Sequence, residues 1–256
     1  MSSSAVAVCP APHLSLIVPV YNGADRLPAS LEQLRTFLRA QPYASELILV
    51  DDCSNATTRA ILEEFAHTMG DVRLIRNEEN RGKGHAVTRG MRAAVGNYRV
   101  FTDADLAYPA SEVGKILADL EGGADVAIAC RVLAESRYLM SPTFFSYLYT
   151  RHVMSRAFNA LVRLTLIPRV LDTQAGLKGF TAHAAEIIFP RITIPGFGFD
   201  VEALFIAKKH DLSLAQTAVF FRYDEEPTTV RFAEDALRMV RDLVHIRRSD
   251  WRGRYA

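Results

Sequence analysis

Residues 98–105 read Tyr-Arg-Val-Phe-Thr-Asp-Ala-Asp, an apolar run that ends in two carboxylates, Asp103 and Asp105. Alternate residues of an extended chain point the same way, so both carboxylates can converge on one hard cation. Mg²⁺ is typically held by one or two carboxylates together with substrate phosphates. The stretch predicts a strand that ends at a metal site, where the metal would bind a diphosphate. An ordinary turn, which aspartate also favours, fits the same residues.

Strands and helices alternate around this stretch. Short apolar runs rich in β-branched residues predict further buried strands over 14–20, 46–50, 72–75 and 124–129. Helical periodicity between them predicts helices over 26–40, about 57–68, 84 to about 95, and 110–120. This alternation indicates an α/β fold with a mainly parallel, Rossmann-like sheet flanked by helices.

Charged residues follow the predicted strands at the same end. In open α/β sheets, ligands bind outside the carboxyl ends of the strands. The residues at such ends are Asp51, Asp52, Asp103, Asp105 and Arg131. We therefore expect them to share one edge of the sheet, where they form the candidate site.

The second half of the chain is less regular. It predicts a helix over 144–167, a polar loop leading into a short apolar segment over 171–180, a helix within 196–209 and a strand over 212–223. An amphipathic helix follows over about 230–248. No Pro/Gly/Ser-rich linker or repeat divides the chain, so we expect one domain over residues 1–256, with its core at about 14–223.

Composition excludes several classes of function. The chain has 256 residues and a net charge of +1, which does not favour a nucleic-acid partner. Its three cysteines, Cys9, Cys53 and Cys130, lack metal-ligand spacing, and their odd number favours a reducing compartment. The first 13 residues do not resemble a signal peptide, and no apolar run approaches 18 residues. Any membrane contact is therefore expected to be peripheral.

Two further motifs each allow two interpretations. Arg81-Gly-Lys-Gly84 precedes a helix, whose free N–H groups attract anions, and Lys83 adds a positive charge. Taken in isolation, the motif is better explained by a plain turn with a solvated lysine. Asp51-Asp52 can accept hydrogen bonds from a nucleotide base or ribose, or it can form a helix N-cap or a turn before Ser54-Asn55.

The order of these motifs resembles family 2 glycosyltransferases. The segments that carry the resemblance are Val18-Pro-Val-Tyr-Asn22, Leu49-Val-Asp-Asp52, Asn80-Arg-Gly-Lys-Gly84, Asp103-Ala-Asp105, Asp172-Thr-Gln-Ala-Gly-Leu-Lys178 and Gly198-Phe-Asp-Val-Glu202. The last two are similar to the dolichyl-phosphate or polyprenyl-phosphate sugar transferase branch, and most similar to dolichyl-phosphate β-glucosyltransferases. The similarity spans about residues 14–248.

The resemblance implies an inverting enzyme of the GT-A fold that moves a hexose from a nucleoside diphosphate sugar, UDP-glucose above others, to a polyprenyl phosphate. It assigns Pro19, Tyr21, Asp51 and Asp52 to the nucleoside pocket, and Lys83 to the base or pyrophosphate. It assigns Asp103 and Asp105 to Mg²⁺ or Mn²⁺, with Ala104 in the same nucleotide-sugar site, and Asp105 and Arg131 to catalysis. Asp172, Gln174 and Lys178 would border the sugar and acceptor, together with Arg151.

The chemistry of the acceptor fits this assignment. A phosphate monoester is largely ionised at neutral pH, so no strong general base is required. Guanidinium groups bind such a phosphate bidentately, which makes Arg131 and Arg151 the candidates. A soluble hydroxyl acceptor is the rival, and it would need a base such as Asp200 or Glu202. A degenerate subunit that only binds nucleotide sugar is the second rival.

Membrane contact is the remaining expectation. Residues 131–169 hold six arginines and one acid, with aromatic residues among them. Basic and aromatic residues on amphipathic helices suit an anionic membrane surface, here the cytoplasmic face of the membrane. The alternative is helices that simply pack their apolar sides on the domain. A membrane-protein partner or a homo-oligomer is compatible with either.

This sequence also departs from the family's pattern. Ala129-Cys130 stands in place of Gly-Ser before Arg131, and Ala107 stands where the related mannosyl enzymes offer a metal-ligating glutamine. Tyr223-Asp-Glu-Glu-Pro-Thr-Thr-Val230 replaces a usual Trp…Gly-Ser-Lys-Val segment, which removes a lysine and adds acids. These changes bear on the identity of the acceptor more than on the fold.

Overall fold

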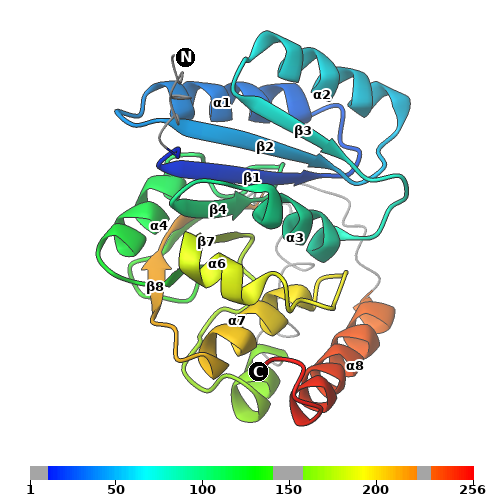
Figure 1. Ribbon diagram of the computed structural model, residues 1–256, viewed down its shortest axis with the longest axis vertical. Helices are drawn as coiled ribbons and strands as arrows, with labels where there is room; N and C mark the ends of the chain where they lie inside the picture. Colours follow the sequence, from blue (N-terminus) through cyan, green and yellow to red (C-terminus); the bar gives the residue numbers. More distant parts are fainter. Residues whose placement is uncertain (1–10, 141–157, 224–231) are drawn as a thin grey trace, which may run out of the picture.

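The computed structural model describes residues 11–140, 158–223 and 232–256. Its centre is a seven-stranded sheet in the order β3-β2-β1-β4-β7-β5-β8 (Figure 1). The strands are β1 (Leu14–Val20), β2 (Ser45–Asp51), β3 (Val72–Arg76), β4 (Tyr98–Thr102), β5 (Val126–Cys130), β7 (Leu177–Thr181) and β8 (Leu214–Ala218). All neighbours pair in parallel except β7, which is antiparallel to both β4 and β5. This topology confirms the predicted α/β class.

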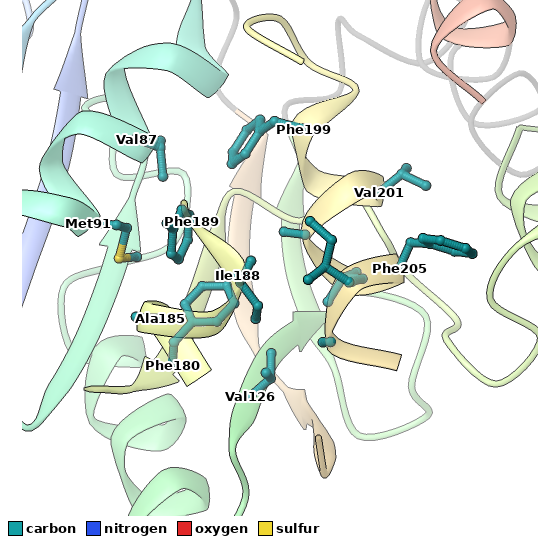
Figure 2. Close-up of a cluster of buried hydrophobic side chains, with 14 of the residues drawn as sticks. Val87, Met91, Val126, Phe180, Ala185, Ile188, Phe189, Phe199, Val201 and Phe205 are labelled. Carbon is teal, nitrogen blue, oxygen red and sulfur yellow. The ribbon is translucent and has the colours of Figure 1, made fainter. Parts of the chain in front are cut away.

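Helices cover both faces of the sheet. They are α1 (Leu27–Arg39), α2 (Ala56–Thr68), α3 (Lys83–Ala93), α4 (Glu112–Glu121), α6 (Ala182–Ile188), α7 (Phe199–Lys209) and α8 (Phe232–Trp251). Alternate strand residues point to opposite faces. Ile17 accordingly joins the core under α3, α6 and α7, and Val18 joins the core under α1 and α4. Figure 2 shows the first of these cores, where the rings of Phe180 and Phe189 meet edge to face at 5.0 Å.

The first half of the chain follows the sequence prediction closely, whereas the second half follows it only in part: α7 lies within the predicted 196–209, but the strands differ. The predicted loop and apolar segment over 171–180 contains β7, and α6 follows it directly. The predicted strand over 212–223 is two strands, β8 and β9 (Phe220–Tyr223), which belong to different sheets. They separate at Val219, whose N–H donates to the Ser136 hydroxyl at 3.1 Å. Strand β9 instead pairs in parallel with β6 (Arg137–Met140), which was not predicted.

Two helical predictions have a partial outcome. Residues 158–165, the described end of the helix predicted over 144–167, are helical, and residues 141–157 lie outside the described part of the chain. Helix α8 begins at Phe232 and ends at Trp251, close to the predicted 230–248. Among the described residues, no helix combines the length and the apolar character needed to cross a bilayer.

Candidate active site

The carboxylate of Asp52 holds the turn that precedes α3. Asp52 directly follows β2 and is buried. Its two oxygens accept hydrogen bonds from the backbone N–H groups of Arg81 and Gly82, at 3.2 and 2.8 Å, and from the Asn77 side chain at 2.6 Å. Helix α2 is capped by Asn55 instead, which accepts from Thr58 N–H at 2.9 Å. Of the alternatives open for Asp52, the N-cap is therefore wrong, and this carboxylate positions the Arg81-Gly82-Lys83 turn.

Asp51 ends β2 beside it and is also buried. Its carboxylate accepts from the backbone N–H of Ser54 at 2.8 Å and lies 3.5 Å from the Arg76 guanidinium. The Ser54 contact is the turn that the sequence allowed as an alternative. Both acids therefore stabilise the loops at the carboxyl edge of β2, which is where a nucleoside pocket was expected.

Lys83 reaches from the first turn of α3 to the end of β4. Its Nζ lies 2.5 Å from Asp103 Oδ1 and 5.9 Å from the centroid of the Phe101 ring. Burial acts to lower the pKa of Lys83, but the neighbouring carboxylates of Asp103 and Asp200 outweigh it, and the pKa is raised overall. Lys83 is therefore a fixed positive charge beside the carboxylate pair. The structure favours the interpretation of Arg81-Gly-Lys-Gly84 as a charged site over a plain turn with a solvated lysine.

Asp103 and Asp105 lie together in the turn after β4. Part of the Asp105 side chain is exposed, but desolvation by the surrounding chain, followed by the charge of Asp103, raises its pKa above the ordinary value. Asp105 accepts a hydrogen bond from Ala107 N–H at 3.0 Å, and Leu106 N–H donates to the Asp103 carbonyl at 3.1 Å. The two aspartates thus form a turn and also bring their carboxylates close together. The turn and the metal-binding interpretation of this motif are therefore compatible.

The donor set fits a divalent cation that also binds substrate. In the described part of the chain, no group of three or more His, Cys, Asp or Glu residues could hold a metal by itself. Two adjacent carboxylates with an unfavourable mutual charge are what Mg²⁺ or Mn²⁺ would neutralise, with substrate phosphates as the remaining ligands. Asp103 and Asp105 are therefore the residues that would hold the metal.

Gly176 packs directly against this pair. Its carbonyl accepts from Asp103 N–H at 3.2 Å, and a Cβ placed on Gly176 would lie 1.9 Å from Asp103 Oδ2. The loop before β7 therefore leaves room for the Asp103 carboxylate only because residue 176 has no side chain. Gly176 was not singled out as a site residue from the sequence, since its neighbour in space lies 73 positions away.

We expect Gly176→Ala to displace the Asp103 carboxylate and weaken metal-dependent UDP binding by about tenfold, the order of effect seen when residues that orient metal ligands are lost. Isothermal titration of UDP with Mn²⁺ measures this affinity. Gly114→Ala is the matched control, because a Cβ at that position in α4 meets nothing within 4 Å. Equal UDP affinity in the two variants would contradict the role of the close packing at Gly176.

Arg131 follows β5 and forms an ion pair with Asp172. Its Nε and Nη2 donate to the two oxygens of Asp172 at 2.7 and 2.9 Å, and its backbone N–H donates at 3.1 Å. Burial acts to raise the pKa of Asp172, but the hydrogen bonds and charge of Arg131 prevail and lower it. The structure thus joins two predicted site residues into one bidentate ion pair at the edge of the sheet.

Lys178 is fully buried in the middle of β7. Its Nζ lies 2.5 Å from Asp200 Oδ1, donates to the Ala175 carbonyl at 2.6 Å, and lies 5.5 Å from the Phe101 ring centroid. Burial lowers the pKa of Lys178 and raises that of Asp200, while their mutual attraction opposes both changes. Lys83 and Lys178 therefore approach the same ring, and two ion pairs lie next to each other beneath the site.

Both carboxylates named as possible bases for a hydroxyl acceptor have internal partners. Asp200 is buried and pairs with Lys178. Glu202 is fully buried and accepts from the Thr193 and Ile194 backbone N–H groups, the Thr193 hydroxyl and the Tyr255 hydroxyl. Both carboxylates are therefore engaged by internal partners, and the contacts of Glu202 give it a structural role in this fold.

The remaining predicted residues occupy varied positions. Pro19 is half-buried at the end of β1, and Tyr21 after it is exposed. Ala104 lies between the two aspartates and packs on the core. Gln174 is half-buried, and its backbone N–H lies 3.4 Å from Asp172 Oδ1. Arg151 lies outside the described residues.

Asn77 also belongs to this cluster, although it was not predicted as a site residue. It is buried and bonds Asp52 through its Nδ2, while its Oδ1 accepts from Arg89 at 2.5 Å. The available signal was its position directly after β3, at the same carboxyl edge as the acids. A single asparagine after a short strand is too common to be identified as a site residue from the sequence. Its contacts with Asp52 and Arg89 appear only in the folded structure.

Comparison with known proteins agrees with this geometry. The Glycosyl transferase family 2 family matches residues 15–160. The human protein named dolichyl-phosphate beta-glucosyltransferase is 32% identical over 93% of this chain and 76% of its own length. The Dictyostelium discoideum protein of the same name is 30% identical over 92% of this chain and 74% of its own length.

The fold also matches solved structures. Glucosyl-3-phosphoglycerate synthase from Mycobacterium tuberculosis, in complex with Mn²⁺ and UDP-glucose, aligns with a TM-score of 0.64, 18% identity, and coverage of 92% of this chain and 79% of that chain. At this identity the likeness establishes the fold, which confirms the GT-A type expected from the resemblance. The chain is a glycosyltransferase, and it belongs to glycosyl transferase family 2.

Proposed function

We propose that this chain transfers glucose from UDP-glucose to a dolichyl or other polyprenyl phosphate, with inversion at the anomeric carbon and with Mg²⁺ or Mn²⁺. The observation that carries the proposal is the meeting of Asp103, Asp105 and Lys83 at one edge of the sheet, beside the turn that Asp52 holds. The names of the relatives support glucose and dolichyl phosphate as the substrates.

The reaction joins an acceptor phosphate oxygen to C1 of glucose and breaks the bond from C1 to the UDP oxygen, which leaves with the electron pair. Attack from the side opposite the departing UDP inverts C1. A divalent metal held by Asp103 and Asp105 would supply positive charge to the diphosphate. Lys83, which is cationic because of its acidic neighbours, stabilises the negative charge that develops on the leaving group.

The internal pairing of both candidate bases is consistent with a phosphate acceptor. The acceptor's second pKa is about 6, so the attacking oxygen is already ionised at neutral pH. Asp200 and Glu202 are both occupied by internal partners. An acceptor hydroxyl would have to lose a proton to some group, and neither of the two carboxylates that the sequence suggested is free to take it.

The experiment that tests the function is transfer of radiolabelled glucose from UDP-glucose to a detergent-solubilised polyprenyl phosphate with Mn²⁺. The expected result is a glucosylated lipid phosphate, with no product from the corresponding polyprenol and none after EDTA. GDP-mannose in place of UDP-glucose tests the donor. Transfer to the free alcohol would overturn the lipid-phosphate acceptor. Tight binding of UDP-glucose without any transfer would favour the rival of a non-catalytic subunit.

We also propose that the protein works at the cytoplasmic face of a membrane through α8. Val240, Val244 and Trp251 repeat at helical spacing, and their exposed fractions are 45%, 47% and 81%. Leu164 of the neighbouring helical segment is 86% exposed, and Arg247 of α8 donates to the Thr165 carbonyl, which joins the two. Residues 238–256 contain six arginines and two acids. Exposed apolar and basic side chains together suit an anionic lipid surface.

We expect Trp251→Ser to reduce the fraction of protein that sediments with anionic vesicles by about threefold or more, because the indole no longer enters the interface. The melting temperature should stay unchanged, since this side chain is already exposed. Val95→Ser is the control, because Val95 is 57% exposed and lies two residues beyond the end of α3, away from α8 in the sequence. Equal sedimentation of the two variants would place the lipid-binding surface elsewhere.

A further inference from the structure

Glu202 is a buried carboxylate that the proposed mechanism does not use. Glu202 on α7 has no exposed surface and receives four donors. Its Oε2 accepts from the Thr193 and Ile194 backbone N–H groups at 3.0 and 2.8 Å, and its Oε1 accepts from the Thr193 and Tyr255 hydroxyls, both at 2.6 Å. Hydrogen bonds to a charged acceptor are stronger than neutral ones, so this carboxylate fixes residues 193–194 firmly.

The segment that Glu202 fixes lies against the Arg81-Gly-Lys-Gly84 turn. The Pro195 carbonyl accepts from His85 N–H at 3.0 Å. A Cβ on Gly82 would lie 2.8 Å from the Pro195 oxygen, and one on Gly84 would lie 2.7 Å from the Gly196 oxygen. Both glycines of the motif are thus required by the close approach of residues 194–196. The turn is held on one side by Asp52 and on the other by this segment.

Lys83 lies between these two glycines, and its Nζ reaches Asp103. A continuous series of contacts therefore connects the Tyr255 hydroxyl to Lys83. It passes through Glu202, residues 193–195 and the His85 N–H. Tyr255 is fully buried although it is the penultimate residue of the chain, and its ring packs on Phe205 with centroids 6.0 Å apart. Burial and the adjacent Glu202 raise the pKa of Tyr255, so its hydroxyl remains a donor.

We propose that Glu202, with the Tyr255 hydroxyl that completes its set of donors, is a positioning residue for Lys83. Glu202 has no exposed surface, and its role is to fix the 193–196 segment on which the Arg81-Gly-Lys-Gly84 turn rests. The consequence for nucleotide binding rests on the proposed function, but the mechanical link between the C-terminal end of the chain and the turn does not.

Amide hydrogen exchange on the ligand-free protein tests the link directly. Tyr255→Phe removes the hydroxyl and keeps the ring, and Thr193→Val removes a second donor to the same carboxylate. Both variants are expected to raise exchange rates in peptides covering 82–86 by about fivefold to tenfold, the effect of losing one typical hydrogen bond. Ser15→Ala is the matched control. Its hydroxyl donates to the buried Glu46 at 2.5 Å, but Ser15 lies at the amino end of β1.

A second measurement connects this link to nucleotide binding. Titration of UDP with Mn²⁺ is expected to give a Kd about threefold higher for Tyr255→Phe and Thr193→Val, and unchanged for Ser15→Ala. Unchanged exchange over 82–86 in both variants, or an equal increase in Ser15→Ala, would overturn the proposal, because the effect would then be absent or global. If exchange changes as expected but the unmodified protein binds no UDP, the proposed function fails and the positioning of Lys83 stands.

Discussion

Asp105→Ala is expected to abolish metal-dependent UDP binding while the protein stays folded. Asp103 and Asp105 are the carboxylates that we propose as metal ligands, and a cation shared with a diphosphate cannot be held well by one of them. Loss of a residue that merely orients a ligand costs about 10–100-fold in metal affinity, so loss of the ligand itself should exceed about 100-fold.

The stability of the same variant separates binding from folding. Desolvation by the surrounding chain and the charge of Asp103 raise the pKa of Asp105, so its ionisation costs more free energy in the ligand-free fold than in the unfolded chain. Removing the carboxylate relieves that repulsion, so the melting temperature should be unchanged or slightly higher. The substitution also removes the hydrogen bond from Ala107 N–H, which lies at an exposed turn where water can replace the acceptor.

Titration of UDP with Mn²⁺ and with EDTA measures the effect. Asp71→Ala is the control, because Asp71 is an exposed acid immediately before β3, at the opposite end of the strands. The control should bind UDP with Mn²⁺ like the unmodified protein and lose binding with EDTA. UDP affinity in Asp105→Ala that equals the control, with and without EDTA, would remove the metal from the mechanism.

The parts of the site that the sequence predicted share one property: their positions follow from local pattern. The β-branched runs before Asp51 and Asp103 identify buried strands, and parallel strands bring their carboxyl ends to one edge. That is sufficient to gather Asp52, Lys83 and Asp103, as the contacts of Gly82 and Lys83 show. This inference did not require knowing which strands pair, because all parallel strands of a βαβ pattern end at the same edge of the sheet.

The parts that the sequence missed depend on partners far along the chain. Strand β7 carries Lys178 at its buried centre, which is tolerable only because Asp200 neutralises it from α7. Seen alone, Leu177–Thr181 contains a lysine and a glycine, and both disfavour a strand. The division of residues 212–223 at Val219 likewise depends on Ser136, 83 positions away. The pairing of Arg131 with Asp172 could not be inferred, since each was expected to face substrate.

Arg131→Ala is expected to destabilise the fold as well as impair transfer. Asp172 is 1% exposed and would remain as a buried charge without its bidentate partner. Breaking a buried pair in this way costs about 3–5 kcal/mol, and the partial exposure of Arg131 reduces the expected loss to about 2–4 kcal/mol. Urea denaturation at pH 7 measures the free energy of unfolding. A loss below about 0.5 kcal/mol would show that solvent already screens the pair.

The pH dependence of this loss has a definite sign. Arg131 holds the pKa of Asp172 below its usual value. The pair therefore stabilises the fold fully at any pH above the pKa of an aspartate in the unfolded chain, about 3.9. This contribution is lost as the pH falls through the lower pKa of the folded protein. In Arg131→Ala, the guanidinium no longer opposes the effect of burial, and only the weaker influences of the residue 131 N–H and the Lys178 charge remain, so the pKa of Asp172 rises. Protonation then relieves the buried charge, so the difference in unfolding free energy should shrink as the pH is lowered from 7 towards 4.

The double variant Arg131→Ala/Asp172→Asn separates stability from chemistry. The asparagine keeps the shape of the side chain and still accepts the backbone N–H of residue 131, but it leaves no buried charge. We therefore expect it to regain more than half of the lost unfolding free energy. If the guanidinium also serves the substrate phosphates, transfer should stay at least about tenfold below the unmodified protein, because one charged donor to the reacting groups is missing. Recovery of transfer together with stability would make the pair purely structural and would move phosphate binding to other cations of the site, with Lys83 the first to be tested.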